Sequence, residues 1–98
     1  MTIEIKRNAE EIILQIAGRL DTTTAPALDK SILENINGIK SLVLDLKELE
    51  YISSAGLRVL LSAQKKMQQI GEMKVINVCE EVMEVFEITG FADILVIE

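Results

Sequence analysis

The chain contains no histidine and no tryptophan, and it has only one cysteine and one proline among its 98 residues. Without histidine, a nucleophilic serine lacks its usual general base, and a metal site lacks its commonest ligand. The lone cysteine, Cys79, cannot form an internal disulfide, which favours a reducing compartment such as the cytoplasm. We therefore expect no catalytic residue, no metal site and a non-enzymatic role.

Positive charge is also scarce, because 10 Lys and Arg residues stand against 16 Asp and Glu residues, for a net charge of −6. An acidic surface repels phosphate backbones and anionic lipids, so nucleic acid and membrane surfaces are poor partners. No apolar run approaches the roughly 18 residues of a membrane-spanning helix. The alternating start, Met1–Lys6, is unlike a secretory signal. We expect a cytoplasmic protein that does not insert into membranes.

Glycine is sparse where nucleotide-binding proteins need it. Gly56 is the only glycine at the junction between a buried-strand pattern, Leu42–Leu46, and the helix pattern that follows. Neither the G-x-x-x-x-G-K-[ST] phosphate loop nor the G-x-G-x-x-G fingerprint is present. We expect no bound cofactor.

The hydrophobic residues, 49% of the chain, follow strand and helix periods in turn. Alternation predicts a β-hairpin from Ile3–Ile5 and Ile12–Ile16, after which Gly18–Asp21 takes the chain out of the sheet. Further patterns predict helices at 25–36, 54–70 and 80–89, and strands at 42–46, 73–78 and 94–97. This order predicts one α/β domain whose mixed central sheet, from β-β-α-β-α-β-α-β, has helices packed against it.

Two details of this prediction concern the middle of the chain. The continuous apolar run Leu42–Leu44 is typical of a central strand that is covered on both faces. Glu48 and Glu50, on either side of Leu49, indicate a solvated loop rather than a calcium site.

The most informative stretch is Tyr51–Leu57, which leads into the amphipathic helix and carries two adjacent serines, Ser53 and Ser54. A helix N-terminus offers free N–H groups and the positive end of the helix dipole, so a phosphate attached there is favourable. Serine is also among the commonest residues that cap a helix. A serine at this junction is therefore either a cap or the acceptor of a regulatory phosphate.

Two stretches resemble motifs of the STAS-domain family, in particular the bacterial anti-sigma-factor antagonists. Gly18–Thr22 is similar to the family's Gly-x-Leu/Ile-Asp turn. Leu44–Leu46, followed by Tyr51–Leu57, is similar to its phosphoacceptor segment, usually Asp-Ser-Ser/Thr-Gly-Leu. The resemblance covers essentially the whole chain and implies a single STAS domain at residues 1–98.

The resemblance implies that Ser54 is the phosphorylated serine, with Ser53 as the second choice, and that Asp21 lies close to it. The unphosphorylated protein then binds an anti-sigma factor that is also a serine kinase of the histidine-kinase-like ATPase fold, and so frees a sigma factor. Phosphorylation reverses the capture, and a metal-dependent serine phosphatase restores it. The implied partner-binding residues are Asp21, Thr22, Ser53, Ser54, Ala55, Gly56, Leu57 and Arg58.

The chain departs from the family pattern in three places. Ser53 replaces the usual Asp, Ala55 replaces the second hydroxyl residue, and no helix follows the last predicted strand. We expect the third departure to leave a sheet face or edge open for a weak homodimer. Arg58 is either an ordinary exposed helix residue or a contact for a phosphate or a partner.

A second function, from another class, is compatible with the same residues. The chain also resembles STAS proteins that serve as accessory subunits of transporters, for example of lipid-transport ABC systems. Such a subunit would bind the ATP-binding subunit of the transporter without any phosphorylation. In that case the serine at the helix start would serve only as a cap.

Overall fold

A computed structural model describes all residues from Met1 to Glu98. Its strands are β1 (Thr2–Asn8), β2 (Glu11–Leu20), β3 (Ser41–Asp45), β4 (Leu49–Ile52) and β5 (Glu72–Ile76). Its helices are α1 (Ala25–Asn35), α2 (Ser54–Ile70) and α3 (Glu80–Thr89), and a short 3-10 helix, η1 (Phe91–Asp93), follows them. The chain is an α/β domain with a mixed sheet, as the hydrophobic pattern predicts.

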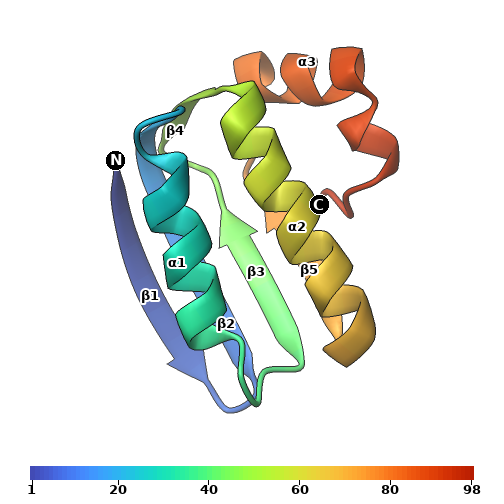
Figure 1. Ribbon diagram of the computed structural model, residues 1–98. Helices are drawn as coiled ribbons and strands as arrows, with labels where there is room; N and C mark the ends of the chain where they lie inside the picture. Colours follow the sequence, from blue (N-terminus) through green and yellow to red (C-terminus); the bar gives the residue numbers. More distant parts are fainter.

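The sheet has the strand order β1-β2-β3-β5, and β4 pairs with the end of β2 (Figure 1). β1 and β2 form the predicted antiparallel hairpin, while β2, β3 and β5 are parallel neighbours. β3 lies between β2 and β5, which confirms that it is a central strand.

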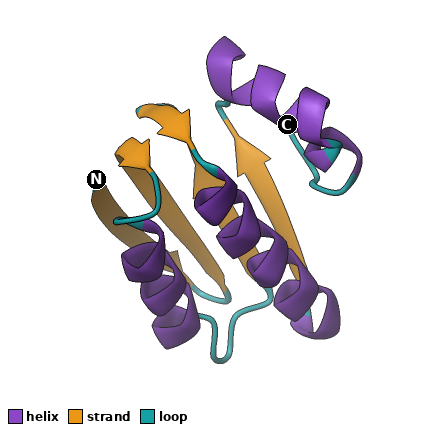
Figure 2. Cartoon of the chain, turned by 45° about the horizontal axis from the view of Figure 1, so that its top comes forward, coloured by secondary structure: helices purple, strands orange, loops and turns teal.

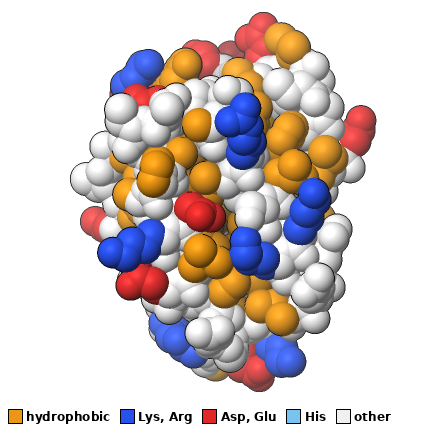
Figure 3. Space-filling model, viewed as in Figure 1, with side chains coloured by type: hydrophobic (Ala, Val, Ile, Leu, Met, Phe, Trp, Pro, Cys, Tyr) orange, Lys and Arg blue, Asp and Glu red, His pale blue; other side chains and the backbone are white.

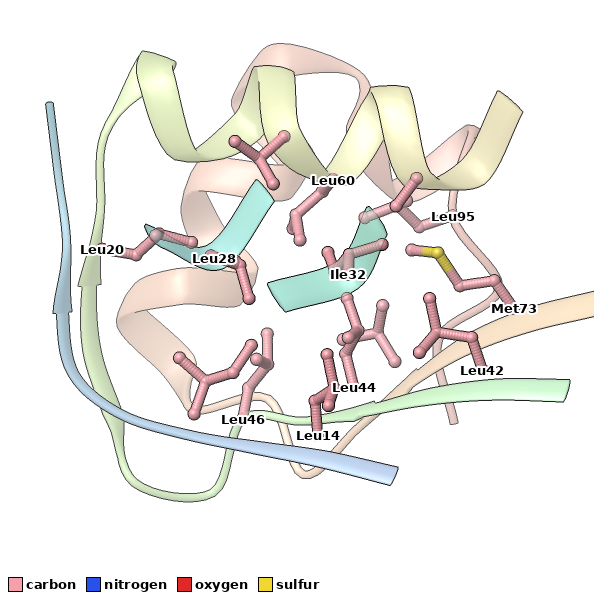
Figure 4. Close-up of a cluster of buried hydrophobic side chains, with 14 of the residues drawn as sticks. Leu14, Leu20, Leu28, Ile32, Leu42, Leu44, Leu46, Leu60, Met73 and Leu95 are labelled. Atoms are coloured by element: carbon pink, nitrogen blue, oxygen red, sulfur yellow. The ribbon is translucent and has the colours of Figure 1, made fainter. Parts of the chain in front are cut away.

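Helices α1 and α2 lie together on one face of the sheet, and α3 packs at its end against β4 (Figures 1 and 2). Leu14 and Leu44 point from the strands toward Leu28 of α1 and Leu60 of α2 (Figure 4). All four side chains are completely buried in one core cluster. None of the three helices combines the length and the apolar character that crossing a bilayer requires.

The opposite face of β3 is also covered, as the continuous apolar run predicts. Val43 points away from Leu42 and Leu44, and it is only 3% exposed. Its neighbours in register are Ile13 of β2 and Lys74 of β5. The continuous apolar run therefore marks a central strand that is buried on both faces, although α1 and α2 lie together on one of them.

Strand β4 replaces the solvated loop that the glutamates of this segment indicate. Leu49 and Ile52 are 2% and 3% exposed, whereas Glu50 and Tyr51 between them face solvent. β2 continues to Leu20 to pair with this strand, after a register shift beside Gly18, whose φ is 96°. The chain therefore leaves the sheet later than predicted.

The predicted last strand at 94–97 is not formed. The chain makes η1 instead, and a single parallel bridge between Val75 and Ile97 joins its end to β5. Leu95 is buried in the core at 5% exposure, while Ile94 and Val96 on either side of it are 44% and 50% exposed, so the segment keeps the alternation of a strand without the ladder of one. β5 also ends at Ile76, two residues before its predicted end.

Candidate functional site

The two motifs identified in the sequence meet at one end of the sheet. β2 and β4 are parallel neighbours with Leu20 in register with Ile52, so both strands end at the same edge. The backbone N–H of Ser53 donates to the carbonyl of Leu20 at 2.9 Å, which ties the start of α2 to the end of β2. The structure thus brings the Asp21 turn beside Ser53.

Asp21 closes the turn between β2 and α1. One of its carboxylate oxygens accepts from the Thr23 hydroxyl at 2.7 Å and from the N–H groups of Thr23 and Thr24 at 3.0 and 3.1 Å. The Thr23 hydroxyl and these N–H groups outweigh desolvation and hold the pKa of Asp21 below its ordinary value. Asp21 is therefore a structural part of the turn as well as a negative charge near the serines.

The two serines have different roles in the helix. Ser53 is the N-cap of α2, because its backbone is extended and its side-chain oxygen accepts the N–H of Gly56 at 3.3 Å. Ser54 is the first helical residue and is exposed, and the cap leaves its hydroxyl free. The alternative that Ser54 only caps the helix is therefore wrong, because Ser53 is the cap.

Gly56 and Leu57 belong to the core, which corrects the expectation that they offer surface to a partner. Leu57 is only 6% exposed, and Gly56 is buried. A Cβ atom on Gly56 would lie 2.7 Å from Leu20 Cγ and 2.8 Å from Ile52 Cγ1. Glycine thus lets the start of α2 approach the ends of β2 and β4 closely. Gly56 and Leu57 are buried residues that hold the two serines in place, and they are not a contact surface.

The remaining partner-surface residues lie at or near the protein surface. We call them the Ser54 surface; Thr22, Ser54 and Arg58 are exposed, and Asp21, Ser53 and Ala55 are half-buried. Arg58 follows Ser54 by four residues, so the two side chains are neighbours on the helix surface. The ion pair of the structure joins Lys74 to Glu98, which leaves the Arg58 guanidinium without a carboxylate partner.

Sequence reasoning missed one pair beside this surface. The Arg19 guanidinium carbon lies 4.1 Å from the centre of the Tyr51 ring, a cation–π geometry, and both residues are exposed. The two residues are in register on β2 and β4. Only the parallel pairing of these strands brings them together, and the failure to predict β4 hid that pairing.

Charge is distributed unevenly around the site. Helix α2 carries three basic residues, Arg58, Lys65 and Lys66, and no acidic residue, although the whole chain has a net charge of −6. Figure 3 shows Lys and Arg side chains along the course of this helix, with apolar side chains between them. The Ser54 surface therefore lies at the positive end of a basic helix.

The chemistry of this surface follows from the side chains that it contains. Histidine is absent from the chain, so no imidazole stands beside Ser54 to act as a base. No group of three or more carboxylates or cysteines is placed to hold a metal ion. What the geometry offers is a free hydroxyl at a helix N-terminus with an arginine one turn away.

Comparisons with known proteins identify the family of the chain. Residues 2–98 match the STAS domain family model. The anti-sigma-B factor antagonist of Bacillus subtilis is 32% identical over 96 residues, which cover 97% of this chain and 88% of that protein.

Solved structures share the fold. An anti-sigma factor antagonist from Mycobacterium paratuberculosis superimposes with a TM-score of 0.89 at 23% identity, covering 98% of this chain and 83% of that one. The Bacillus cell fate determinant SpoIIAA, in its phosphorylated form, gives 0.78 at 15% identity, covering 99% and 91%. With the family match over nearly its whole length, the chain belongs to the STAS-domain family.

Proposed function

We propose that this chain is a non-enzymatic anti-sigma-factor antagonist that binds an anti-sigma factor while Ser54 is unphosphorylated and releases it after phosphorylation. One observation carries the proposal: Ser54 is exposed at the first position of α2 while its neighbour Ser53 supplies the cap. The B. subtilis relative, named an antagonist of an anti-sigma factor, supports the partner class. The phosphorylated form of SpoIIAA supports the modification.

The phosphate is compatible with the folded domain. It would lie at the positive end of the α2 dipole, and Arg58, one turn along, can pair with it. Phosphorylation therefore changes the surface without unfolding the helix.

The same phosphate opposes docking. It brings about −1.5 to −2 charges to a surface that must lose water against a partner. Asp21, whose lowered pKa keeps it ionised, adds a second negative charge near Ser53. Desolvation and repulsion together weaken the complex, which is the basis of the switch.

The partner and the enzymes that act on Ser54 follow from the same proposal. The anti-sigma factor is also the serine kinase, with the histidine-kinase-like ATPase fold, and a metal-dependent serine phosphatase removes the phosphate. These proteins meet in the cytoplasm. The relatives named antagonists do not favour the transporter-subunit alternative.

The test compares what four immobilised proteins retain from a lysate of the native cell, identified by mass spectrometry. The baits are the wild type, Ser54→Asp, the neutral isostere Ser54→Asn, and Ser53→Ala, which alters the cap and keeps Ser54. We expect the wild type, Ser54→Asn and Ser53→Ala to retain a serine-kinase ATPase, and Ser54→Asp to lose at least about 90% of it, about a tenfold weakening or 1.4 kcal/mol.

Two outcomes would contradict the proposal. A kinase retained equally by Ser54→Asp and Ser54→Asn would mean that charge at this position does not control capture. A transporter ATPase retained by all four baits would move the function to the accessory-subunit class.

A further inference from the structure

The two edges of the sheet differ in how far they are covered. β5 has a bridge to the end of the chain through Val75 and Ile97. β1 pairs with β2 on one side and has no strand on the other (Figures 1 and 2). Its outer row of N–H and C=O groups is therefore available to another strand.

The residues of β1 place opposite charges at matching distances from its centre. Ile5 is the middle residue of Thr2–Asn8, and Glu4 and Lys6 flank it. Ile5 is in register with the buried Leu14, so it lies on the helix side of the sheet, while Glu4 and Lys6 lie on the open side. All three of these β1 side chains are exposed, Ile5 by 47%.

A second copy of the same strand fits this edge. In an antiparallel pair centred on Ile5, all seven residues of β1 overlap, and the two Ile5 side chains lie opposite each other. Glu4 of each copy then lies opposite Lys6 of the other, which makes two attractive cross-strand pairs. Registers centred on Glu4 or on Lys6 place like charges opposite each other instead.

Charged residues on an edge strand usually prevent association. A strand whose charges were all of one sign would repel its own copy. In β1, Glu4 and Lys6 are spaced so that the twofold pairing places each of them opposite a charge of the other sign. A twofold, self-complementary contact of this kind gives a closed dimer, the commonest form of homo-oligomer.

We propose that this protein forms a weak homodimer through antiparallel pairing of β1 with β1 of a second copy, centred on Ile5. The contact is one strand wide, well below the ~1,000 Å² that marks a stable interface, so the dimer is a high-micromolar to millimolar species. None of the residues of β1 belongs to the Ser54 surface. The inference therefore does not depend on the proposed function.

The test uses charge reversal at the two flanking residues. Glu4→Lys alone and Lys6→Glu alone each turn both cross-strand pairs repulsive, while the double variant restores both with the signs exchanged. The single variants change the net charge from −6 to −4 and to −8, and the double variant keeps −6. If strand pairing controls association, both single variants associate more weakly than the wild type. If overall charge repulsion controls it, Glu4→Lys associates more strongly than the wild type and Lys6→Glu more weakly.

Sedimentation velocity at constant ionic strength, up to about 1 mM protein, measures the dimer fraction. We expect the wild type and the double variant to associate equally, and each single variant to associate about tenfold more weakly. An equimolar mixture of the two single variants should associate again, because the two lysines of one variant's strand then face the two glutamates of the other's. Circular dichroism checks that all variants remain folded.

Three results would overturn the inference: a wild type that remains monomeric over this range, a Glu4→Lys variant that associates more strongly than the wild type, or a mixture no more associated than its components. The second would show that net charge, and not strand pairing, controls association.

Discussion

The turn after β2 engages the side chains of Asp21, Thr23 and Thr24 in hydrogen bonds, whereas the start of α2, after β4, leaves two polar side chains free. In the first, the Asp21 carboxylate holds Thr23 and Thr24, and the Thr24 hydroxyl also donates to the Arg19 carbonyl at 2.9 Å. In the second, Ser53 makes the cap, and Ser54 and Arg58 face solvent. One turn is built as a support, and the other presents groups that can react or bind.

This difference teaches that a modifiable residue needs a neighbour that does the structural work. If Ser54 were the cap, a phosphate on it would remove a hydrogen bond from the helix start. Because Ser53 is the cap, the proposed acceptor, Ser54, can change its charge while the helix keeps its first turn.

The largest effect should come from disturbing the close packing of α2 on the ends of β2 and β4, at Gly56. We expect Gly56→Ala to lower the free energy of unfolding by about 1–2 kcal/mol and Gly56→Val by about 3 kcal/mol, because a Cβ atom overlaps Leu20 and Ile52. Urea denaturation measures both. Arg58→Val, the same β-branched change at an exposed site of this helix, should cost only about 0.5 kcal/mol. A Gly56→Val protein as stable as Arg58→Val would show that the close approach is not required.

The second prediction separates the two serines. Ser53→Ala should cost about 1 kcal/mol, the usual effect of losing a cap, while Ser54→Ala should change the stability by less than about 0.5 kcal/mol. Thermal and urea unfolding of the two alanine variants give the comparison. Equal costs at the two positions would mean that the cap is shared and that our assignment is wrong.

The third prediction concerns the turn after β2 and pH. Because the pKa of Asp21 is lowered on folding, its ionised form stabilises the protein above the unfolded value of 3.8, and this contribution is lost as the pH falls through the folded pKa. Asp21→Asn should therefore be less stable than the wild type at about pH 6, and the difference should shrink toward about pH 3. Urea midpoints across this pH range measure it.

Asp45 provides the control for the pH prediction, since its pKa is also lowered. Partial burial raises that pKa, but hydrogen bonds from Asn77, Lys47 and Gln15 outweigh it. In the Asp45→Asn variant, the pH-dependent contribution of Asp21 to the free energy of unfolding should remain. A wild type and an Asp21→Asn variant whose stabilities fall in parallel with pH would count against the structural role of Asp21.

The smallest effect should be a gain. Ser54→Asp places a carboxylate at the first position of α2, where the helix dipole favours it by about 0.3–1 kcal/mol at low salt. Unfolding at low and high salt should show a stabilisation that salt weakens, with Ser54→Asn as the neutral control. A destabilised Ser54→Asp protein would mean that its effect on partner capture cannot be separated from damage to the fold.

Long, regular patterns could be predicted from the sequence. Leu57, Leu60, Ala63 and Met67 recur at helical spacing and are buried on one side of α2, and Gly71 ends the helix as expected. The hairpin alternation of β1 and β2 is equally clear. In such elements, periodicity and burial agree over many residues, so the prediction does not depend on any single position.

Short elements are harder to predict from the sequence, and the physical reason differs from one element to the next. In β4 the order buried, exposed, exposed, buried breaks the alternation that marks a strand, and only the pairing with β2 makes it one. At 94–97 the residues favour a strand, but η1 redirects the chain, and a single bridge remains. The identity of the cap, Ser53 rather than Ser54, depends on a one-residue shift that helix boundaries commonly show.

The position of Ser54 inside the helix has a kinetic consequence. A kinase that binds its substrate as an extended strand reaches Ser54 only when the first turn of α2 frays. Fraying breaks the 3.3 Å cap bond and the 2.9 Å bond from the Leu57 N–H to the Ser53 carbonyl. Once attached, the phosphate favours the wound turn through the helix dipole. For enzymes that act on the frayed segment, the proposed phosphorylated form therefore exposes its target less often than the unphosphorylated one, and the proposed phosphate is added more easily than it is removed.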